Sequence, residues 1–161
     1  NLLFADGAAV ARVGAVRGPV RIDAAECVNL PAQAEQMRWF PDDHGLRLRL
    51  AAELPDTLQA NIGEAVDNFL TKHDHKRREI RHWIVHPGGP QILDGVAAGL
   101  GLASDTLDES RVVLREYGNM SSPSVLFALE KALQGGGKPG RWFLSSFGAG
   151  ISCHGALLRV G

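Results

Sequence analysis

A histidine ends a short apolar run in the stretch HWIVHPGGPQILDGV, residues 82–96. Two glycines and two prolines follow His86, and a helical pattern begins after them. In open α/β sheets, ligands bind beyond the carboxyl ends of the strands. Glycines at such a point let a ligand approach the backbone. His86 is therefore a candidate catalytic group; the alternative is a histidine that only closes a strand through hydrogen bonds.

Asn119 is the second candidate, in the stretch REYGNMSSPSV. It stands in a Gly-Asn turn just before a predicted helix. A preorganised side-chain amide can donate to a developing oxyanion. Asn is also a common turn residue that bonds its own backbone. The position of Asn119 alone favours this second interpretation.

The two cysteines are weaker candidates for a nucleophile. Cys153 lies in an apolar strand pattern, which favours a buried and inert thiol. Cys27 lies in an irregular region with no obvious activating partner. Two cysteines in 161 residues do not form a disulfide framework, so the expected location is the reducing cytoplasm.

A basic stretch, KHDHKRREIRH at 72–82, could meet phosphates, and His73 with His75 could touch a metal. Asp74 and Glu79 dilute its charge, so we favour a solvated surface and assign no metal. The formal net charge of −1 argues against nucleic acid and against an anionic membrane surface as partners. No apolar run approaches the roughly 18 residues that cross a bilayer.

The elements that must position these residues alternate between strand and helix. The N-terminal apolar segments 2–4 and 8–16, around a turn at 5–7, predict a strand or hairpin. Residues 17–44 are loop-rich, and the alternating GLRLRL at 45–50 predicts a half-exposed strand. A helix is predicted from Pro55, with an apolar stripe formed by Leu58, Ile62, Val66, Phe69 and Leu70.

The second half of the chain continues the pattern. HWIVH predicts a buried strand, and Pro90 suits the first position of the helix that follows. Residues 101–118 are ambiguous. A helix capped by Ser122 with Pro123 at its first position ends at the glycines 135–137, and two strands around a Gly-Ala-Gly turn close the chain. This order predicts one α/β domain with a mixed sheet.

Taken together, WIVHPGGPQILD and EYGNMSSPSVLFALE resemble the type III polyketide synthases, the chalcone and stilbene synthase family. LLFADGAA and SFGAGIS occur in the same order as that family's corresponding motifs. The resemblance covers nearly the whole chain and falls in the family's C-terminal half. It implies that residues 1–161 are the C-terminal half of a thiolase-like fold, and that the half with the catalytic Cys precedes them in a longer protein.

The resemblance also implies roles for individual residues. His86 and Asn119 match the family's catalytic His and Asn, which stabilise an enolate during decarboxylative condensation of malonyl-CoA onto a Cys-bound starter. Phe4 matches the gatekeeper Phe, and Ser121 borders the substrate pocket. The cyclisation loop matches Phe147, Gly148 and Gly150. The implied substrates are an acyl-CoA starter and malonyl-CoA, with no bound cofactor and a homodimer for the full-length protein.

Two departures from the family pattern bear on the pocket. The family loop usually reads Gly-Pro-Gly, but here Ala149 stands between the glycines, so the loop is expected to be looser. Leu48 stands where plant members tend to carry an aromatic residue, which predicts a roomier pocket for longer or bulkier starters.

The largest departure is that no residue of the chain matches the catalytic Cys. We therefore expect these 161 residues alone to be inactive, and to lack the N-terminal basic residues that hold coenzyme A in the family. Two alternatives remain open at this point. One is a non-catalytic thiolase-like domain that binds or assembles with a partner, and the other is a ketoacyl synthase of fatty acid synthesis.

Overall fold

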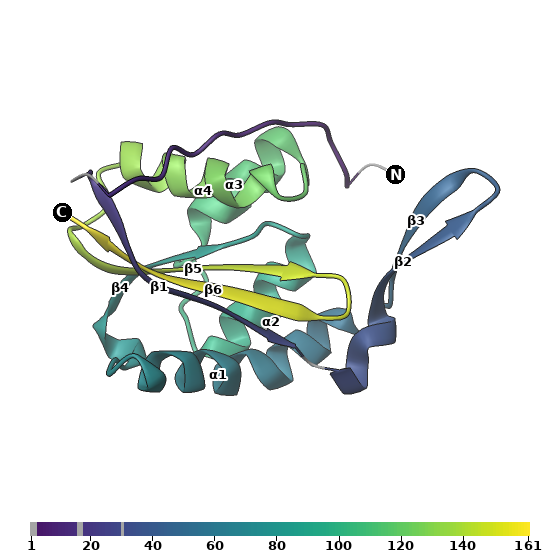
Figure 1. Cartoon of the computed structure of the whole chain (residues 1–161), viewed down its shortest axis with the longest axis horizontal. Coiled ribbons are helices and arrows are strands. Elements are labelled where there is room, and N and C mark those ends of the chain that lie inside the picture. The colour runs from purple at the N-terminus through teal and green to yellow at the C-terminus, as the bar shows by residue number, and fades with distance from the viewer. Residues whose placement is uncertain (1–2, 16–17, 30) are drawn as a thin grey trace.

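Four strands form the central sheet, in the order β1-β6-β5-β4 (Figure 1). β1 (Val20–Asn29) pairs antiparallel with β6 (Ser152–Val160), and β6 pairs antiparallel with β5 (Gly140–Gly148). β5 runs parallel to β4 (Ile80–Val85). The computed structural model describes residues 3–15, 18–29 and 31–161. It confirms the predicted mixed sheet and the paired strands at the end of the chain.

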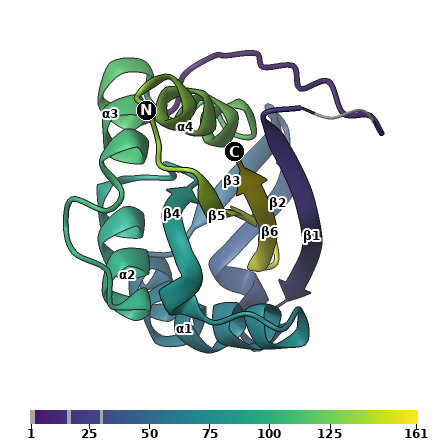
Figure 2. The same cartoon turned by 90° about the vertical axis from the view of Figure 1, so that its left-hand side faces the viewer.

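Helices cover both faces of this sheet (Figure 2). α1 (Leu54–Lys72) and α2 (Pro90–Leu100) pack on one face, and α4 (Pro123–Gln134) packs on the other with α3 (Asp108–Tyr117) beside it. All five residues of the predicted α1 stripe are buried. Each face of the sheet thus has its own hydrophobic core.

Glycines bring α1 and α2 into close backbone contact. A Cβ on Gly95 would lie 2.6 Å from the Pro55 carbonyl oxygen, and one on Gly63 would lie 2.8 Å from the Gly99 carbonyl oxygen. Any larger side chain at these points would push the helices apart. The contact between α1 and α2 holds the start of α2 in place. The loop that carries His86 leads directly into that start.

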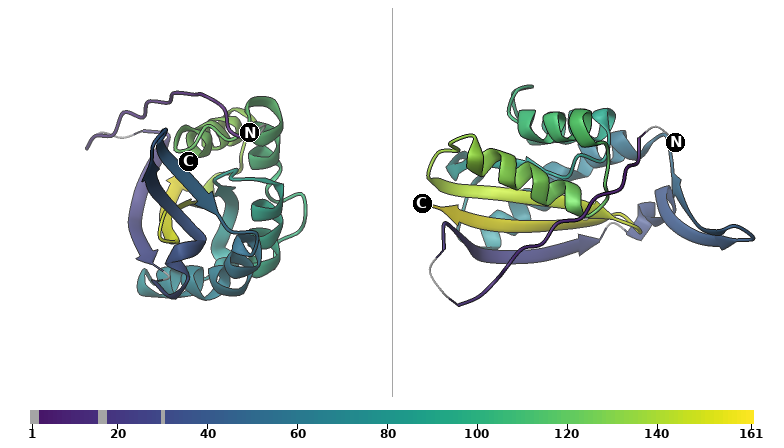
Figure 3. Two further views of the ribbon diagram at one scale, coloured as in Figure 1. Left: turned by 90° about the vertical axis from the view of Figure 1, so that its right-hand side faces the viewer. Right: turned by 90° about the horizontal axis from the view of Figure 1, so that it is seen from above.

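A two-stranded hairpin, β2 (Met37–Asp42) and β3 (Gly45–Leu50), projects from one end of the molecule (Figures 1 and 3). It follows the 3-10 helix η1 (Pro31–Gln36). Gly45 closes its turn with a φ of +115°, which favours glycine. The predicted strand at 45–50 is confirmed, and among the described strands it pairs only with β2.

The N-terminal prediction was wrong. Phe4 forms a single bridge with Asn119, and residues 5–14 form no regular element, although residues 2 and 16 lie outside the described part of the chain. This segment runs extended across the molecule on the α4 side (Figure 3). Apolar composition suggested strands there, but within the described ranges no strand pairs with residues 5–14 in a ladder of hydrogen bonds.

The loop-rich assignment of residues 17–44 also missed β1, β2 and η1. β1 is an edge strand that is exposed over much of its length, so its burial does not alternate regularly. It also contains a register shift between Ile22 and Ala24, which breaks the two-residue period. The ambiguous stretch 101–118 contains α3. No described helix is long and apolar enough to cross a membrane.

Candidate functional site

His86 extends the parallel pairing of β4 by one step. Its backbone N–H donates to the Ser145 carbonyl oxygen at 2.8 Å, and its own carbonyl accepts from Gly88 N–H at 2.8 Å. These two bonds fix the backbone at the carboxyl end of the strand. The imidazole Nε2 lies beside Gly88, since a Cβ there would be only 3.7 Å from it. A Cβ at position 88 would therefore make an ordinary van der Waals contact with the imidazole.

Burial lowers the pKa of His86 to about 4, because the charged imidazolium would lose its water. At neutral pH the ring is therefore uncharged, with one nitrogen that donates and one that accepts. A neutral histidine can still donate a hydrogen bond to an oxygen on which negative charge develops.

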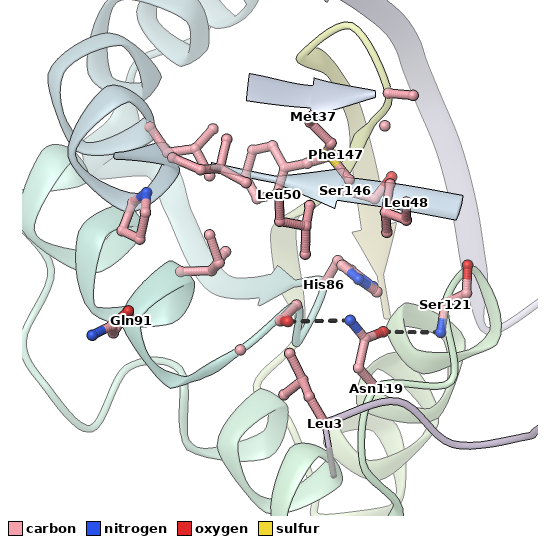
Figure 4. Close-up of a pocket in the computed structure, with 18 of the residues that line it drawn as sticks. Leu3, Met37, Leu48, Leu50, His86, Gln91, Asn119, Ser121, Ser146 and Phe147 are labelled. Carbon is pink, nitrogen blue, oxygen red and sulfur yellow. Dashed lines mark hydrogen bonds between the residues drawn. The ribbon is translucent and has the colours of Figure 1, made fainter. Parts of the chain in front are cut away.

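The Asn119 side chain is held at both ends of its amide (Figure 4). Its Nδ2 donates to the Gly88 carbonyl oxygen at 3.1 Å, and its Oδ1 accepts from Ser121 N–H at 2.9 Å. A carbonyl must accept and an N–H must donate, so these two partners define the orientation of the amide. One N–H of Nδ2 remains for a ligand.

The N-terminal segment clamps the backbone of the same residue. Asn119 N–H donates to the Leu3 carbonyl oxygen at 2.8 Å, and Ala5 N–H donates to the Asn119 carbonyl oxygen at 2.9 Å. Gly118 precedes this clamp with a φ of +73°. A Cβ on Gly118 would lie 3.1 Å from the Ala5 Cβ and 3.2 Å from the Leu3 carbonyl oxygen. Asn119 is thus fixed through backbone and side chain together.

The start of α4 corrects one expectation. Ser122 makes no side-chain capping bond. Instead, Ser124 Oγ accepts from Met120 N–H at 2.8 Å, from inside the first turn. Ser121 has a φ of +64° while its N–H holds Asn119. The tight turn at 118–121 therefore directs the Asn119 amide, and Pro123 starts the helix behind it.

His86 and Asn119 face one large cavity of about 880 Å³ (Figure 4). Of the predicted pocket residues, Phe4, Leu48, Ser121, Phe147 and Gly148 line it. Gly150 does not line it; its N–H donates to the Met37 carbonyl oxygen at 2.7 Å and so ties the β5–β6 loop to β2. Among the described lining residues, only His86 and His154 have titratable side chains.

One wall of the cavity comes from the apolar face of the β2–β3 hairpin. Met37 pairs with Leu50 and Trp39 pairs with Leu48, so the four side chains share a face. All four line the cavity. Trp39 is 52% exposed and was missed from the sequence. The sequence does contain a pattern that indicates this hairpin face. Apolar residues at 37, 39 and 41 stand opposite those at 46, 48 and 50 across the turn.

The cysteines lie outside this cavity. Cys153 is buried as predicted, and burial raises the pKa of its thiol to about 11, which keeps it protonated. Cys27 is exposed on β1, with its Sγ 3.9 Å from His154 Nε2. It therefore has a histidine neighbour that the sequence did not suggest.

The histidines of the basic stretch bind acidic side chains. His73 Nε2 lies 2.8 Å from Glu26 Oε1, and His75 Nδ1 lies 2.9 Å from Glu79 Oε2. In the described part of the chain, no group of three or more His, Cys, Asp and Glu side chains could hold a metal ion.

Comparison with known proteins places this site in context. The family profile of chalcone and stilbene synthases, C-terminal domain, matches residues 22–160. A 3,5-dihydroxyphenylacetyl-CoA synthase of Amycolatopsis balhimycina is 33% identical over 99% of this chain and 45% of its own. A putative chalcone synthase of Bacillus subtilis (strain 168) is 29% identical over 93% of this chain and 44% of its own.

Solved structures agree. PKS-I from the brown alga Ectocarpus siliculosus superimposes with a TM-score of 0.82 at 32% identity, covering 94% of this chain and 42% of that one. The 1,3,6,8-tetrahydroxynaphthalene synthase of Streptomyces coelicolor A3(2), a bacterial type III polyketide synthase, gives 0.81 at 28% identity, covering 88% and 41%. The fold is thus thiolase-like, and the chain spans less than half the length of these relatives.

Proposed function

The chain belongs to the chalcone and stilbene synthase family as its C-terminal domain, and from this we propose that it supplies half of the active site of a type III polyketide synthase. The other half, with the nucleophilic cysteine, lies outside the 161 residues. Alone, the chain does not condense substrates. The full-length enzyme acts as a homodimer on an acyl-CoA starter and malonyl-CoA.

The reaction starts with transfer of the starter. The cysteine thiolate attacks the acyl-CoA thioester, and coenzyme A leaves as its thiol. Malonyl-CoA then loses carbon dioxide, because its carboxylate carbon–carbon bond breaks and the electron pair moves into a thioester enolate. The enolate carbon attacks the Cys-bound acyl group. A new carbon–carbon bond forms, and the cysteine leaves as thiolate for the next cycle.

His86 and Asn119 donate hydrogen bonds to the thioester oxygen as enolate charge develops on it. The observation that carries this role is the double anchoring of the Asn119 amide, which leaves one N–H for the cavity that His86 also lines. Preorganised donors need no reorientation during the reaction, so they stabilise the charged state more than the ground state.

The surroundings favour decarboxylation. The described lining carries no Asp, Glu, Lys or Arg side chain, and Phe4 adds an apolar surface next to Asn119. A carboxylate is poorly stabilised in such an environment without a cation. Loss of carbon dioxide removes that charge from the apolar wall and moves it to the oxygen that His86 and Asn119 face.

The test is to incubate the full-length enzyme with malonyl-CoA and a panel of starters, and to analyse the products for pyrones and resorcinols. His86→Ala and Asn119→Ala should each lower malonyl-CoA decarboxylation by about a hundredfold or more. Two matched controls use exposed residues of the same type: His44→Ala in the hairpin turn and Asn68→Ala on α1. Both controls should keep full activity.

Full activity in either site variant would refute its assigned role. Absence of a cysteine at a strand-to-helix junction in the upstream sequence, together with no product from any starter, would instead favour a non-catalytic binding or assembly domain. The family match favours the polyketide synthases over the ketoacyl synthases of fatty acid synthesis.

A further inference from the structure

Three arginines stand in one row across the sheet, at the end away from His86. Arg21 on β1 pairs with Arg159 on β6, and Arg159 pairs with Arg141 on β5. Directly paired residues share a face, so the three guanidinium groups lie on the same side of the sheet. Like charges in such positions destabilise a sheet. Arg141 and Arg159 come from the hairpin that ends the chain, and Arg21 comes from a strand far from them in the sequence.

One carboxylate partly offsets the charge of this row. Asp23 stands at the register shift of β1, and both Arg21 and Arg159 donate to it, at 2.5 and 2.8 Å. Burial alone would raise the pKa of Asp23, but the hydrogen bonds from these arginines hold it below its usual value. Asp23 therefore stays ionised, with two cations for its single charge.

The basic stretch that the sequence singled out lies beside the row. Arg141 Nε donates to His75 Nε2 at 3.2 Å, and its Nη1 lies 4.0 Å from Glu79. Arg81 packs against Gly140, where a Cβ would be 2.9 Å from Arg81 Cγ. The row and the stretch thus lie side by side, and six of their cations are together called the basic end: Arg21, Lys76, Arg78, Arg81, Arg141 and Arg159.

Three cations of the basic end are available to a partner. Lys76, Arg78 and Arg81 are exposed, and no ion pair joins them to another residue in the described part of the chain. The basic end holds six of the 17 Lys and Arg residues, and three of the 18 acidic ones, Asp23, Asp74 and Glu79, lie in the row or the stretch. The rest of the chain is therefore net acidic, and the positive charge is concentrated at one end.

This surface is separate from the candidate active site. Arg81 and His86 lie near opposite ends of β4, five residues or roughly 17 Å apart at about 3.3 Å per residue. In Figure 1 the basic end is where β4 and β5 begin and β6 ends, while the hairpin beside the cavity projects from the other end. A ligand at the basic end cannot touch the reacting atoms.

We propose that the basic end is a docking surface for an acidic segment of another protein, and this goes beyond the proposed function. The guanidinium group of arginine binds a carboxylate through two parallel hydrogen bonds. Asp23 and Glu79 interrupt the positive charge, so a partner with spaced carboxylates fits better than a continuous polyphosphate. The six residues that define the basic end include no Phe, Tyr or Trp on which bases could stack.

The test measures binding of the full chain to fluorescein-labelled poly-L-glutamate by fluorescence anisotropy at about 0.05 M salt, where surface charges are weakly screened. Lys76→Gln, Arg78→Gln and Arg81→Gln combined should weaken binding by about tenfold or more. The matched control removes three other exposed cations, through Arg38→Gln, Arg49→Gln and Arg115→Gln, and should change affinity by less than about twofold.

Circular dichroism checks that both variants fold, which we expect because none of the three substituted residues of the basic end is buried. Equal weakening in both variants would overturn the proposal, since it would report net charge alone. Tighter binding of short duplex DNA or of pyrophosphate than of polyglutamate would also overturn it. Neither result would affect the proposed function, because decarboxylation is not measured.

Discussion

Burial keeps His86 neutral, and this has a consequence for stability. An unperturbed histidine has a pKa of 6.5, while the folded chain lowers it to about 4. Between these values the unfolded chain binds a proton that the folded chain does not. The contribution of His86 is complete above pH 6.5 and decreases as the pH falls toward 4, by up to about 3 kcal/mol.

Urea unfolding of the chain at pH 7 and at pH 4.5 measures this loss, with His86→Gln as the matched variant. Gln cannot be protonated, and both proteins share the same carboxylates. The difference in free energy of unfolding between the two proteins, compared at the two pH values, therefore reports the protonation of His86. A pH-independent difference over this range would mean that the ring is charged, or already solvated, in the folded chain.

Gly118 is the residue on which the position of Asn119 most depends. Gly118→Ala places a Cβ against the Leu3 carbonyl oxygen at a positive φ, and should cost about 1–3 kcal/mol of stability. The control is Gly101→Ala, in the left-handed region at φ +67° and ψ +33° with nothing within 4 Å, whereas the ψ of −171° at Gly118 strains any other residue more. Gly101→Ala should cost about 1 kcal/mol from backbone strain alone.

Chemical unfolding compares the two glycine variants, and under the proposed function malonyl-CoA decarboxylation by the full-length protein should fall only for Gly118→Ala. Equal costs would show that the contact with residues 3–5 adds nothing. The position of Asn119 in the sequence favoured a turn residue, and the family resemblance was needed to assign it a catalytic role. The bonds from Leu3, Ala5 and Gly88 depend on long-range packing, so no local pattern could predict them.

At the level of elements, helix propensity and packing have opposite effects where α1 crosses α2. An alanine at Gly99 would favour the helix but would disturb the contact between the two helices. Gly99→Ala should stabilise an isolated helix by about 1 kcal/mol. In the protein the new methyl group meets the Gln59 carbonyl on α1, which cannot move without shifting the helix. We expect a net loss of about 1–3 kcal/mol in the free energy of unfolding.

Ala98→Gly, at the exposed neighbouring position, is the control for this prediction. It should cost about 1 kcal/mol through propensity alone, with no packing effect. Thermal or urea unfolding distinguishes the two, and a stabilised Gly99→Ala protein would contradict close packing at the crossing.

The elements also show where sequence patterns suffice. α1, α2 and α4 have apolar stripes against one core each, so their periodicity predicts them. β5 and β6 flank a glycine turn and are covered on both faces. β1 was missed because it lies at an edge and carries a register shift, and its pairing partner follows more than 120 residues later. The position of β1 in the sheet depends on its pairing with β6, which the local sequence pattern of β1 does not reveal.

For the whole molecule, the cavity predicts starter preference if the proposed function holds. Its hairpin wall is apolar and Leu48 is smaller than an aromatic residue. Leu48→Phe in the full-length enzyme should lower kcat/KM for long-chain acyl-CoA relative to short-chain starters by about tenfold. Leu46→Phe is the control, because Leu46 shares the hairpin face but does not line the cavity.

Competition between a long and a short starter, with products quantified by mass spectrometry, reads out this ratio. The idea fails if the unmodified enzyme rejects fatty acyl-CoA starters, or if both leucine variants shift the ratio equally. Most of the residues that the resemblance of motifs predicted for the pocket meet in the cavity, but Gly150 does not line it. The resemblance could not predict the role of Trp39 in the hairpin wall.

The clamp on Asn119 also bears on where the domain can be cut. The family match begins at residue 22, but the strand-like segment that holds Asn119 lies at residues 3–5. A protein engineer who excised the domain at the homology boundary would keep the sheet and both cores. The same excision would remove two backbone bonds from Asn119 and the Phe4 wall. Module swaps between relatives should therefore carry these first residues along with the domain.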